Sequence, residues 1–257
     1  MMLLNTIAAS MRLARRHIIS RRRWVVAVAI IIIPAILAFM ASRRIPQERG
    51  EIYTWIVFLM IGGILIPYLA AFLGSSIVGD EIEGRTLVYL WTRPHGRHTI
   101  FLWEYLFVAI WIALVAAVAV ALTFLLLYSA LDVQGIGSNL RMAMWDMIAL
   151  ASGGAAYAAI AFLLSTFLKS PLTIMIVYIA ADNGVQFMPG FLKLLFVRHY
   201  QLAMSSNPMT DSPEGFFKFL AENQTTPETA AISLAAIALT ALIAGAVMLN
   251  KREYVKS

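Results

Sequence analysis

Long apolar runs, separated by short charged segments, dominate the chain. Six of these runs are long enough to cross a bilayer, because a spanning helix needs about 20 predominantly apolar residues. They are Trp24–Ser42, Ile52–Val78, Tyr105–Leu131, Met147–Leu168, Ser170–Leu192 and Thr229–Asn250. Backbone polar groups in lipid must be bonded within the protein, and the runs do not alternate as barrel strands do. The pattern predicts an all-α membrane protein with six transmembrane helices.

The composition agrees with a membrane protein. Hydrophobic residues make up 61% of the chain and charged residues 13%, against about 45–50% and about 25% in soluble domains. No cysteine is present, which excludes disulfides and thiolate sites. The net charge of +6 indicates cytoplasmic segments that meet anionic lipid. Membrane lipid, and not nucleic acid, is therefore an expected partner.

The basic residues predict the orientation. With both termini cytoplasmic, most of the 20 Lys and Arg residues lie on the cytoplasmic side, as the positive-inside rule requires. In residues 1–23, Leu4 and Ile7 fall on one helical face while Arg12 and Arg16 fall roughly opposite. This segment is predicted to be an amphipathic interfacial helix, the alternative being a basic tail that only sets the topology. The apolar run after it is longer than the ~7–15 residues of a signal-peptide core, so we expect it to be retained as a span.

The loop between the second and third spans, residues 79–101, is the longest predicted cytoplasmic loop and the richest in charge. Its acids, Asp80, Glu81 and Glu83, precede its bases, Arg85, Arg93 and Arg97. This order suits the dipole of a short helix, and Pro94 and Gly96 would end it. A short cytoplasmic helix at Glu81–Thr92 is the prediction.

No enzyme motif accompanies these features. The chain lacks the phosphate-binding loop G-x-x-x-x-G-K-[ST], the metal motif H-E-x-x-H and the nucleophile elbow G-x-S-x-G. His95 and His98 are three residues apart, but Gly96 lies between them and no third ligand is near. We expect no catalytic residue, no metal site and no cofactor bound by this chain.

Asp182 is the clearest polar feature inside a predicted span. Asn183 follows it, and Gln186 lies one helical turn further on. Ionisable residues at this depth are costly and often functional, so these three residues are candidates for a substrate pathway. Alternatively, the fifth helix ends early, near Gly184, and Asp182 caps the segment after it. The sequence leaves both interpretations open.

Residues 191–228 contain two apolar patches that are too short to span. Phe191–Val197 is the first patch, and the second surrounds Lys218. Short apolar runs are candidates for interfacial or re-entrant segments. Short amphipathic or re-entrant helices near the outer surface are therefore expected between the fifth and sixth spans.

The stretch Gly79–Pro94, GDEIEGRTLVYLWTRP, resembles the signature of ABC type 2 transporter permeases. That signature has acids, a Gly, a Thr-Leu pair, further apolar residues and a Pro eight positions after the Thr. Thr86 and Pro94 keep this spacing, whereas Arg85 separates Gly84 from Thr86 where a Gly-Thr pair is usual. The resemblance extends to the layout of the whole chain.

The resemblance implies a single permease domain over residues 1–257, in the cell (inner) membrane. It implies an ABC ATP-binding subunit as a partner, which binds ATP and Mg, and a second permease copy, identical or related. In the family the loop after the second span forms a coupling helix on the ATPase. The implied coupling residues are Asp80, Glu81, Glu83, Gly84, Arg85, Thr86, Leu87, Leu90 and Pro94. Glu81 and Glu83 are expected to pair with basic groups, and Leu87 and Leu90 to anchor the helix.

The expected function is that of a permease subunit of an ABC transporter, an exporter that works by alternating access. One alternative is a stand-alone secondary transporter or channel that uses Asp182. Such transporters are built from internal repeats, and none is evident in the chain. A membrane-embedded enzyme is a third hypothesis, which would need paired catalytic groups within the spans.

Overall fold

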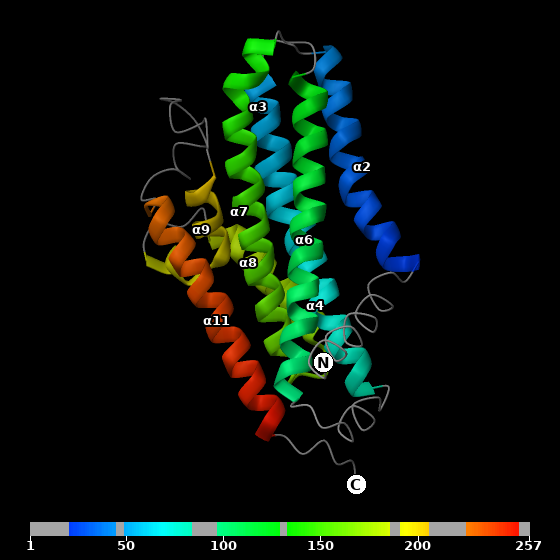
Figure 1. The fold of residues 1–257 in the computed structure, drawn as a ribbon, viewed down its shortest axis with the longest axis vertical. Coiled ribbons are helices and arrows are strands. Elements are labelled where there is room, and N and C mark those ends of the chain that lie inside the picture. Colours follow the sequence, from blue (N-terminus) through cyan, green and yellow to red (C-terminus); the bar gives the residue numbers. More distant parts are fainter. Residues whose placement is uncertain are drawn as a thin grey trace, which may run out of the picture.

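The computed structural model describes residues 21–44, 49–83, 97–128, 133–185, 191–205 and 225–251. These residues are almost entirely helical, and none of them lies in a strand. Long helices lie side by side in an elongated bundle (Figure 1). Five helices in the described part are long and apolar enough to cross a membrane. The predicted all-α membrane architecture is confirmed.

The helices follow one another in chain order. Helix α2 (Arg21–Arg44) comes first, and a continuous second-span helix follows, made of α3 (Arg49–Thr54), the π-helix η2 (Trp55–Leu65) and α4 (Ile66–Glu83). The two longest helices are α6 (Arg97–Tyr128) and α7 (Val133–Ser165). The chain continues through α8 (Pro171–Val185), the 3-10 helix η3 (Phe191–Leu195), α9 (Val197–Met204) and α11 (Pro227–Lys251).

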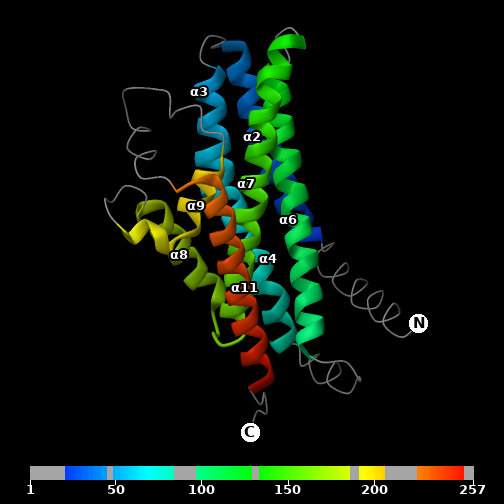
Figure 2. The ribbon, with the colours of Figure 1, turned by 60° about the vertical axis from the view of Figure 1, so that its left-hand side comes forward.

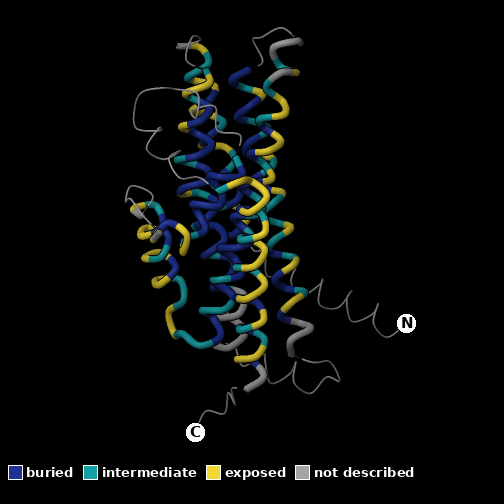
Figure 3. Tube along the Cα trace, turned by 90° about the vertical axis from the view of Figure 1, so that its left-hand side faces the viewer, coloured by how far each residue is buried: buried dark blue, intermediate teal, exposed yellow. Residues whose placement is uncertain are grey.

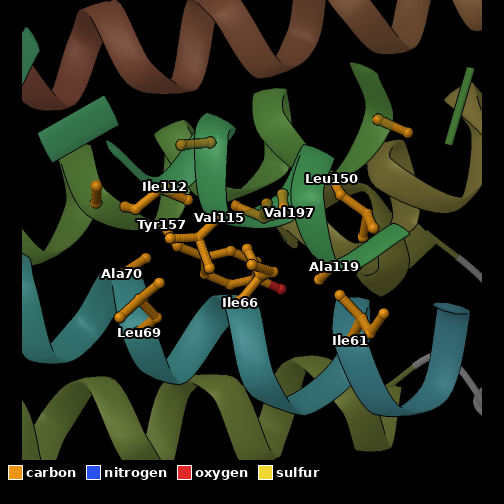
Figure 4. Close-up of a cluster of buried hydrophobic side chains, with 14 of the residues drawn as sticks. Ile61, Ile66, Leu69, Ala70, Ile112, Val115, Ala119, Leu150, Tyr157 and Val197 are labelled. Atoms are coloured by element: carbon orange, nitrogen blue, oxygen red, sulfur yellow. The ribbon is translucent and has the colours of Figure 1, made fainter. Parts of the chain in front are cut away.

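Helix α7 lies at the centre of the bundle, where it packs against α6, α4, α11 and α9. Ile66 and Leu69 of α4 meet Ile112 of α6 and Tyr157 of α7 in the core (Figure 4). Helices α2 and α11 lie on opposite sides of this core in Figure 1. Apolar side chains line their outer faces, with Ile243 of α11 63% exposed, and α11 shows a long exposed face in Figure 3. A surface this apolar is suited to contact with lipid.

Five of the six predicted spans correspond to the candidate spans, and the fifth in chain order is the exception. There the described helix is α8, with 15 residues, or about 22 Å at 1.5 Å per residue. A hydrocarbon core of about 30 Å needs a longer helix. Figure 2 shows α8 climbing only part of the bundle's height before the chain reaches α9. The structure thus shows five candidate spans in its described part.

Two acidic residues that were expected to lie just outside spans are inside helices. The fourth span was predicted to begin at Met147, yet α7 begins at Val133 and contains Asp146. Likewise the third was predicted from Tyr105, and α6 contains Glu104. Both acids are buried. The boundaries were misplaced because a charged residue normally ends an apolar run, whereas these two are shielded by neighbouring helices.

The acids of the cytoplasmic loop also lie in a different element from the one predicted. Backbone residues Asp80–Glu83 form the last turn of α4 and not the start of a separate helix. Residues 84–96, which hold the other predicted coupling residues, lie outside the described part, as do Gln186 and the amphipathic segment up to residue 20. Helices η3 and α9 fall within the segment expected to contain short helices.

Candidate functional site

The second-span helix changes its hydrogen-bond pattern in its middle. Residues Trp55–Leu65 form a π-helix, and the backbone N–H of Ile66 donates to the carbonyl of Ile61, five residues earlier. A π-helical segment inside an α-helix is rare and frequently occurs at functional sites. The segment contains the Gly62-Gly63 pair, and both glycines are buried. The absence of side chains at these glycines leaves room for groups from other helices.

Arg198 of α9 occupies that room. Its side chain is 3% exposed, and Nη2 donates a hydrogen bond to the carbonyl of Phe58 in η2. A Cβ atom built on Gly62 would lie 2.8 Å from Arg198 Nη1, so any larger residue would displace the guanidinium. Nη1 also lies 3.4 Å from Oε1 of Gln201, one turn along α9. The guanidinium therefore joins α9 to the π-helix.

Asn183 of α8 contacts the same segment. Its Nδ2 donates to the carbonyl of Gly63 at 2.8 Å and to that of Ile179, in its own helix, at 2.9 Å. A Cβ on Gly63 would approach Asn183 Oδ1 at 3.1 Å. Two carbonyls of η2, five residues apart, thus accept side-chain hydrogen bonds from α8 and α9. We call these two contacts, Arg198 to Phe58 and Asn183 to Gly63, the polar clasp.

Asp182 lies beside the polar clasp and is fully buried. The hydroxyl of Tyr157, from α7, donates to its Oδ2. The backbone N–H of Arg198 lies 3.2 Å from Oδ2 and 3.3 Å from Oδ1. That N–H belongs to the first turn of α9, whose N–H groups lack partners within the helix, and a carboxylate there is favoured by the helix dipole. Asp182 therefore caps α9 and belongs to an interhelical cluster. Its part in a substrate pathway stays a prediction.

Two buried nitrogens near the polar clasp lack a hydrogen-bond partner among the described residues. They are Nε2 of Gln201 and Nε2 of His199. Gln201 packs directly on Gly153 of α7, where an added Cβ would lie 2.9 Å from its Cδ. Close approach at small residues is how helices pack in membranes.

Helix α9 lies outside the five candidate spans, and burial shifts the charge equilibria of its side chains. Burial lowers the pKa of Arg198 from its ordinary value, and Tyr157 and Asp182 oppose that shift. An arginine nevertheless stays protonated in proteins. Burial, and then the charge of Lys193, lower the pKa of His199, which favours the neutral imidazole.

A second carboxylate–tyrosine pair lies nearer the N-terminus of α7. The hydroxyl of Tyr53, from α3, donates to Oδ2 of Asp146 at 2.9 Å, and both residues are fully buried. Tyr128 of α6 packs edge-on against Tyr53, with ring centroids 6.0 Å apart. Asp146 and Tyr157 are eleven residues apart on α7, three helical turns, so they share one face. This face of α7 carries both carboxylate–tyrosine pairs.

The structure brings only part of the predicted site together. Asp182 and Asn183 lie in one cluster, as expected of a shared site, while Gln186 is outside the described residues. Sequence reasoning missed Arg198, Tyr157 and Asp146. The sequence offered a weak signal for Arg198, which directly follows a short apolar patch. A charged residue at such a place can be buried only if other helices supply hydrogen-bond acceptors.

A bundle of apolar helices around buried polar pairs defines a multi-pass α-helical membrane protein. A protein-family model described as ABC-2 family transporter protein matches residues 11–182. The match covers more than half of the chain, which therefore belongs to the ABC-2 transporter family, as the resemblance in the sequence indicated. No curated protein matches the chain.

Membership defines the general role of the chain. ABC-2 proteins are membrane domains of ABC transporters, and they generally lack an ATPase site of their own and work with an ATP-binding subunit. The matched residues run from before α2 to Asp182, near the end of α8. Helices α9 and α11 lie beyond the match.

Proposed function

We propose that this chain is the permease subunit of an ABC exporter and moves substrate by alternating access, driven by ATP hydrolysis on a separate subunit. The match to the ABC-2 family carries this proposal. Both termini are cytoplasmic in the proposed topology, which needs the chain between Ser170 and Thr226 to return to the extracytoplasmic side in addition to the five candidate spans. A second permease copy completes the transporter. The mostly apolar interior suits lipids, peptides, drugs or hydrophobic metabolites as substrates.

The proposed ATPase-coupling surface begins at the end of α4. Three acids, Asp80, Glu81 and Glu83, lie at the C-terminal end of this helix, and no basic residue lies in its last turn. The negative end of a helix dipole disfavours acids by about 0.3–1 kcal/mol each. Basic groups supplied by an ATP-binding subunit, or by the N-terminal segment, would relieve this repulsion. A push on these residues would travel along one continuous helix to η2, as rigid-body coupling requires.

Co-purification tests the proposal. The tagged chain is solubilised gently from its native membrane, and the proteins bound to it are identified by mass spectrometry. We expect an ATPase with a phosphate-binding loop to accompany the wild type and to be lost from the Glu81→Lys, Glu83→Lys variant. Glu51 and Glu228 are exposed residues on the extracytoplasmic side of the proposed topology. The matched control Glu51→Lys, Glu228→Lys should therefore keep the ATPase.

Two results would contradict the proposal. If the chain purifies alone and transports at full rate after reconstitution alone, it is a stand-alone transporter and Asp182 becomes its candidate coupling site. If both charge-reversed variants lose the ATPase equally, the end of α4 is not the docking surface.

A further inference from the structure

The second-span helix connects the proposed coupling residues to the polar clasp. Helix α4 runs from Glu83 to Ile66, and η2 continues it without a break to Trp55. The acids near Glu83 and the carbonyls of Phe58 and Gly63 therefore lie on one helix. Any displacement of the α4 end must reach η2.

The π-helical segment can convert such a displacement into rotation. Its hydrogen bonds join residues five apart, whereas α4 and α3 join residues four apart. Because the two patterns place different numbers of residues in each turn, a change from one to the other rotates α4 relative to α3. Phe58 and Gly63 are themselves five residues apart, so they lie on adjacent turns of the π-helix, where Arg198 and Asn183 hold their carbonyls.

Helices α8 and α9 are in turn fastened to each other. Asp182 of α8 accepts from the backbone N–H of Arg198, and Tyr178 of α8 stacks on Phe196, the residue before α9, with ring centroids 5.6 Å apart. A displacement of η2 that moves either α8 or α9 through the polar clasp is therefore passed on to the other of these two helices. The charged donor makes the Arg198 bond the stronger of the two clasp contacts, whereas the Asn183 bond joins a neutral amide to a carbonyl.

We infer that Arg198 and Asn183 are positioning residues that couple the second-span helix to the α8–α9 pair, so that ATP-driven movement of α4 is passed through η2 to α9. The inference rests on the proposed function for the source of the movement. The local part, that Arg198 holds η2 against α9 and Asn183 holds it against α8, stands independently of the ATPase.

Spin-label distances test the inference, and the chain has no native cysteine to interfere. One label is placed on Ile64→Cys in η2, which is 52% exposed, and the other on Leu195→Cys beside α9, which is 67% exposed. The local test uses the isolated chain in nanodiscs. We expect one narrow distance distribution in the otherwise wild-type chain and a broadened one after Asn183→Leu, which removes the donor to Gly63.

A matched control separates the polar clasp from general loosening of the second span. Gly74→Ala crowds α4 against α7, where the new Cβ would lie 2.6 Å from the Cβ of Ala161, and it leaves Arg198 and Asn183 untouched. Arg198→Met serves as a second clasp variant. An unchanged distribution in both clasp variants, or equal broadening in Gly74→Ala, would overturn the local part.

The coupling part is measured on the complex with the co-purified ATPase. A third position, Ile110→Cys on the exposed face of α6, is paired with Leu195→Cys. Trapping the complex with ATP and vanadate should shift this distance in the wild type. In Asn183→Leu the shift should be lost while ATP hydrolysis continues.

A shift that persists in both clasp variants would overturn the coupling, and so would its absence from the wild type. Absence of any ATPase from the preparation would instead count against the proposed function, and the isolated-chain distances would still decide the local part.

Discussion

The guanidinium of Arg198 donates a hydrogen bond to the backbone carbonyl of Phe58, a residue 140 positions earlier in the chain. The contact joins α9, which lies after the end of the family match at Asp182, to η2 in the middle of the second span. Removing one member of a buried charge cluster is far more damaging than its net contribution suggests.

The glycine pair in η2 should be intolerant of even one methyl group. A Cβ at Gly62 would lie 2.7 Å from Leu150 Cδ2 as well as 2.8 Å from Arg198 Nη1. Overpacking of this kind costs about 1–3 kcal/mol, so Gly62→Ala should lower the midpoint of thermal unfolding in detergent. Gly50→Ala is the control, because nothing lies within 4 Å of that position. An exposed helical Gly→Ala change should be neutral or stabilise by about 0.4–1 kcal/mol.

The two carboxylate–tyrosine pairs should contribute independently to stability. Tyr157→Phe leaves Asp182 with one donor fewer, and Tyr53→Phe does the same to Asp146. Each change should cost about 1–3 kcal/mol. The two hydroxyls bond different carboxylates, so the costs should add within about 0.5 kcal/mol in the double variant. Unfolding of the four proteins forms the cycle, and a larger interaction energy would show that α7 couples the pairs.

Acid should destabilise the α9 region through His199. Its pKa is lowered in the folded protein by burial and then by Lys193, so the unfolded chain binds a proton more readily. The stability associated with the neutral imidazole is present above the unfolded pKa of about 6.5 and is lost as the pH falls below it. The difference in unfolding midpoint between pH 7.5 and pH 5.5 should therefore be smaller in His199→Gln than in the wild type. An equal difference in the two proteins would show that His199 does not carry this effect.

The proposed topology predicts which exposed positions can be labelled from outside the cell. Gly137 and Thr226 are exposed residues on the extracytoplasmic side of that topology, and Ser170 is an exposed residue on the cytoplasmic side. Single cysteines at these positions are treated with a membrane-impermeant maleimide. Gly137→Cys and Thr226→Cys should react in intact cells, and Ser170→Cys only after lysis. The reverse pattern would invert the orientation.

Much of the bundle was predictable from the sequence because long apolar runs have one stable form in lipid. The spans that begin at Trp24, Ile52 and Thr229 correspond closely to candidate spans of the structure. Span ends were less predictable where acids were treated as boundaries. Asp146 lies inside α7, where the hydroxyl of Tyr53 donates to it, and the two residues are 93 positions apart.

Only the residues of the candidate site that lie in the fifth apolar run could be predicted from the sequence. Asp182 and Asn183 stand out as polar residues in an apolar run, but their partners come from three other elements. The π-helix left no trace in the sequence, because its hydrogen bonds change the backbone pattern without changing the apolar character of residues 55–65. Nothing in the sequence around Arg198 reveals that the carbonyl of Phe58, in η2, accepts a hydrogen bond from its guanidinium.

The most direct test of the account is to identify what touches the end of α4 in the native membrane. A photoactivatable maleimide is attached to Glu83→Cys, which provides a single attachment point in a chain without cysteine. Illumination should join the chain to a protein whose peptides include G-x-x-x-x-G-K-[ST], and the same reagent on Thr226→Cys should not. If position 83 yields no such ATPase, or if position 226 captures it instead, the proposal that ATP hydrolysis on a partner drives this permease through α4 is contradicted.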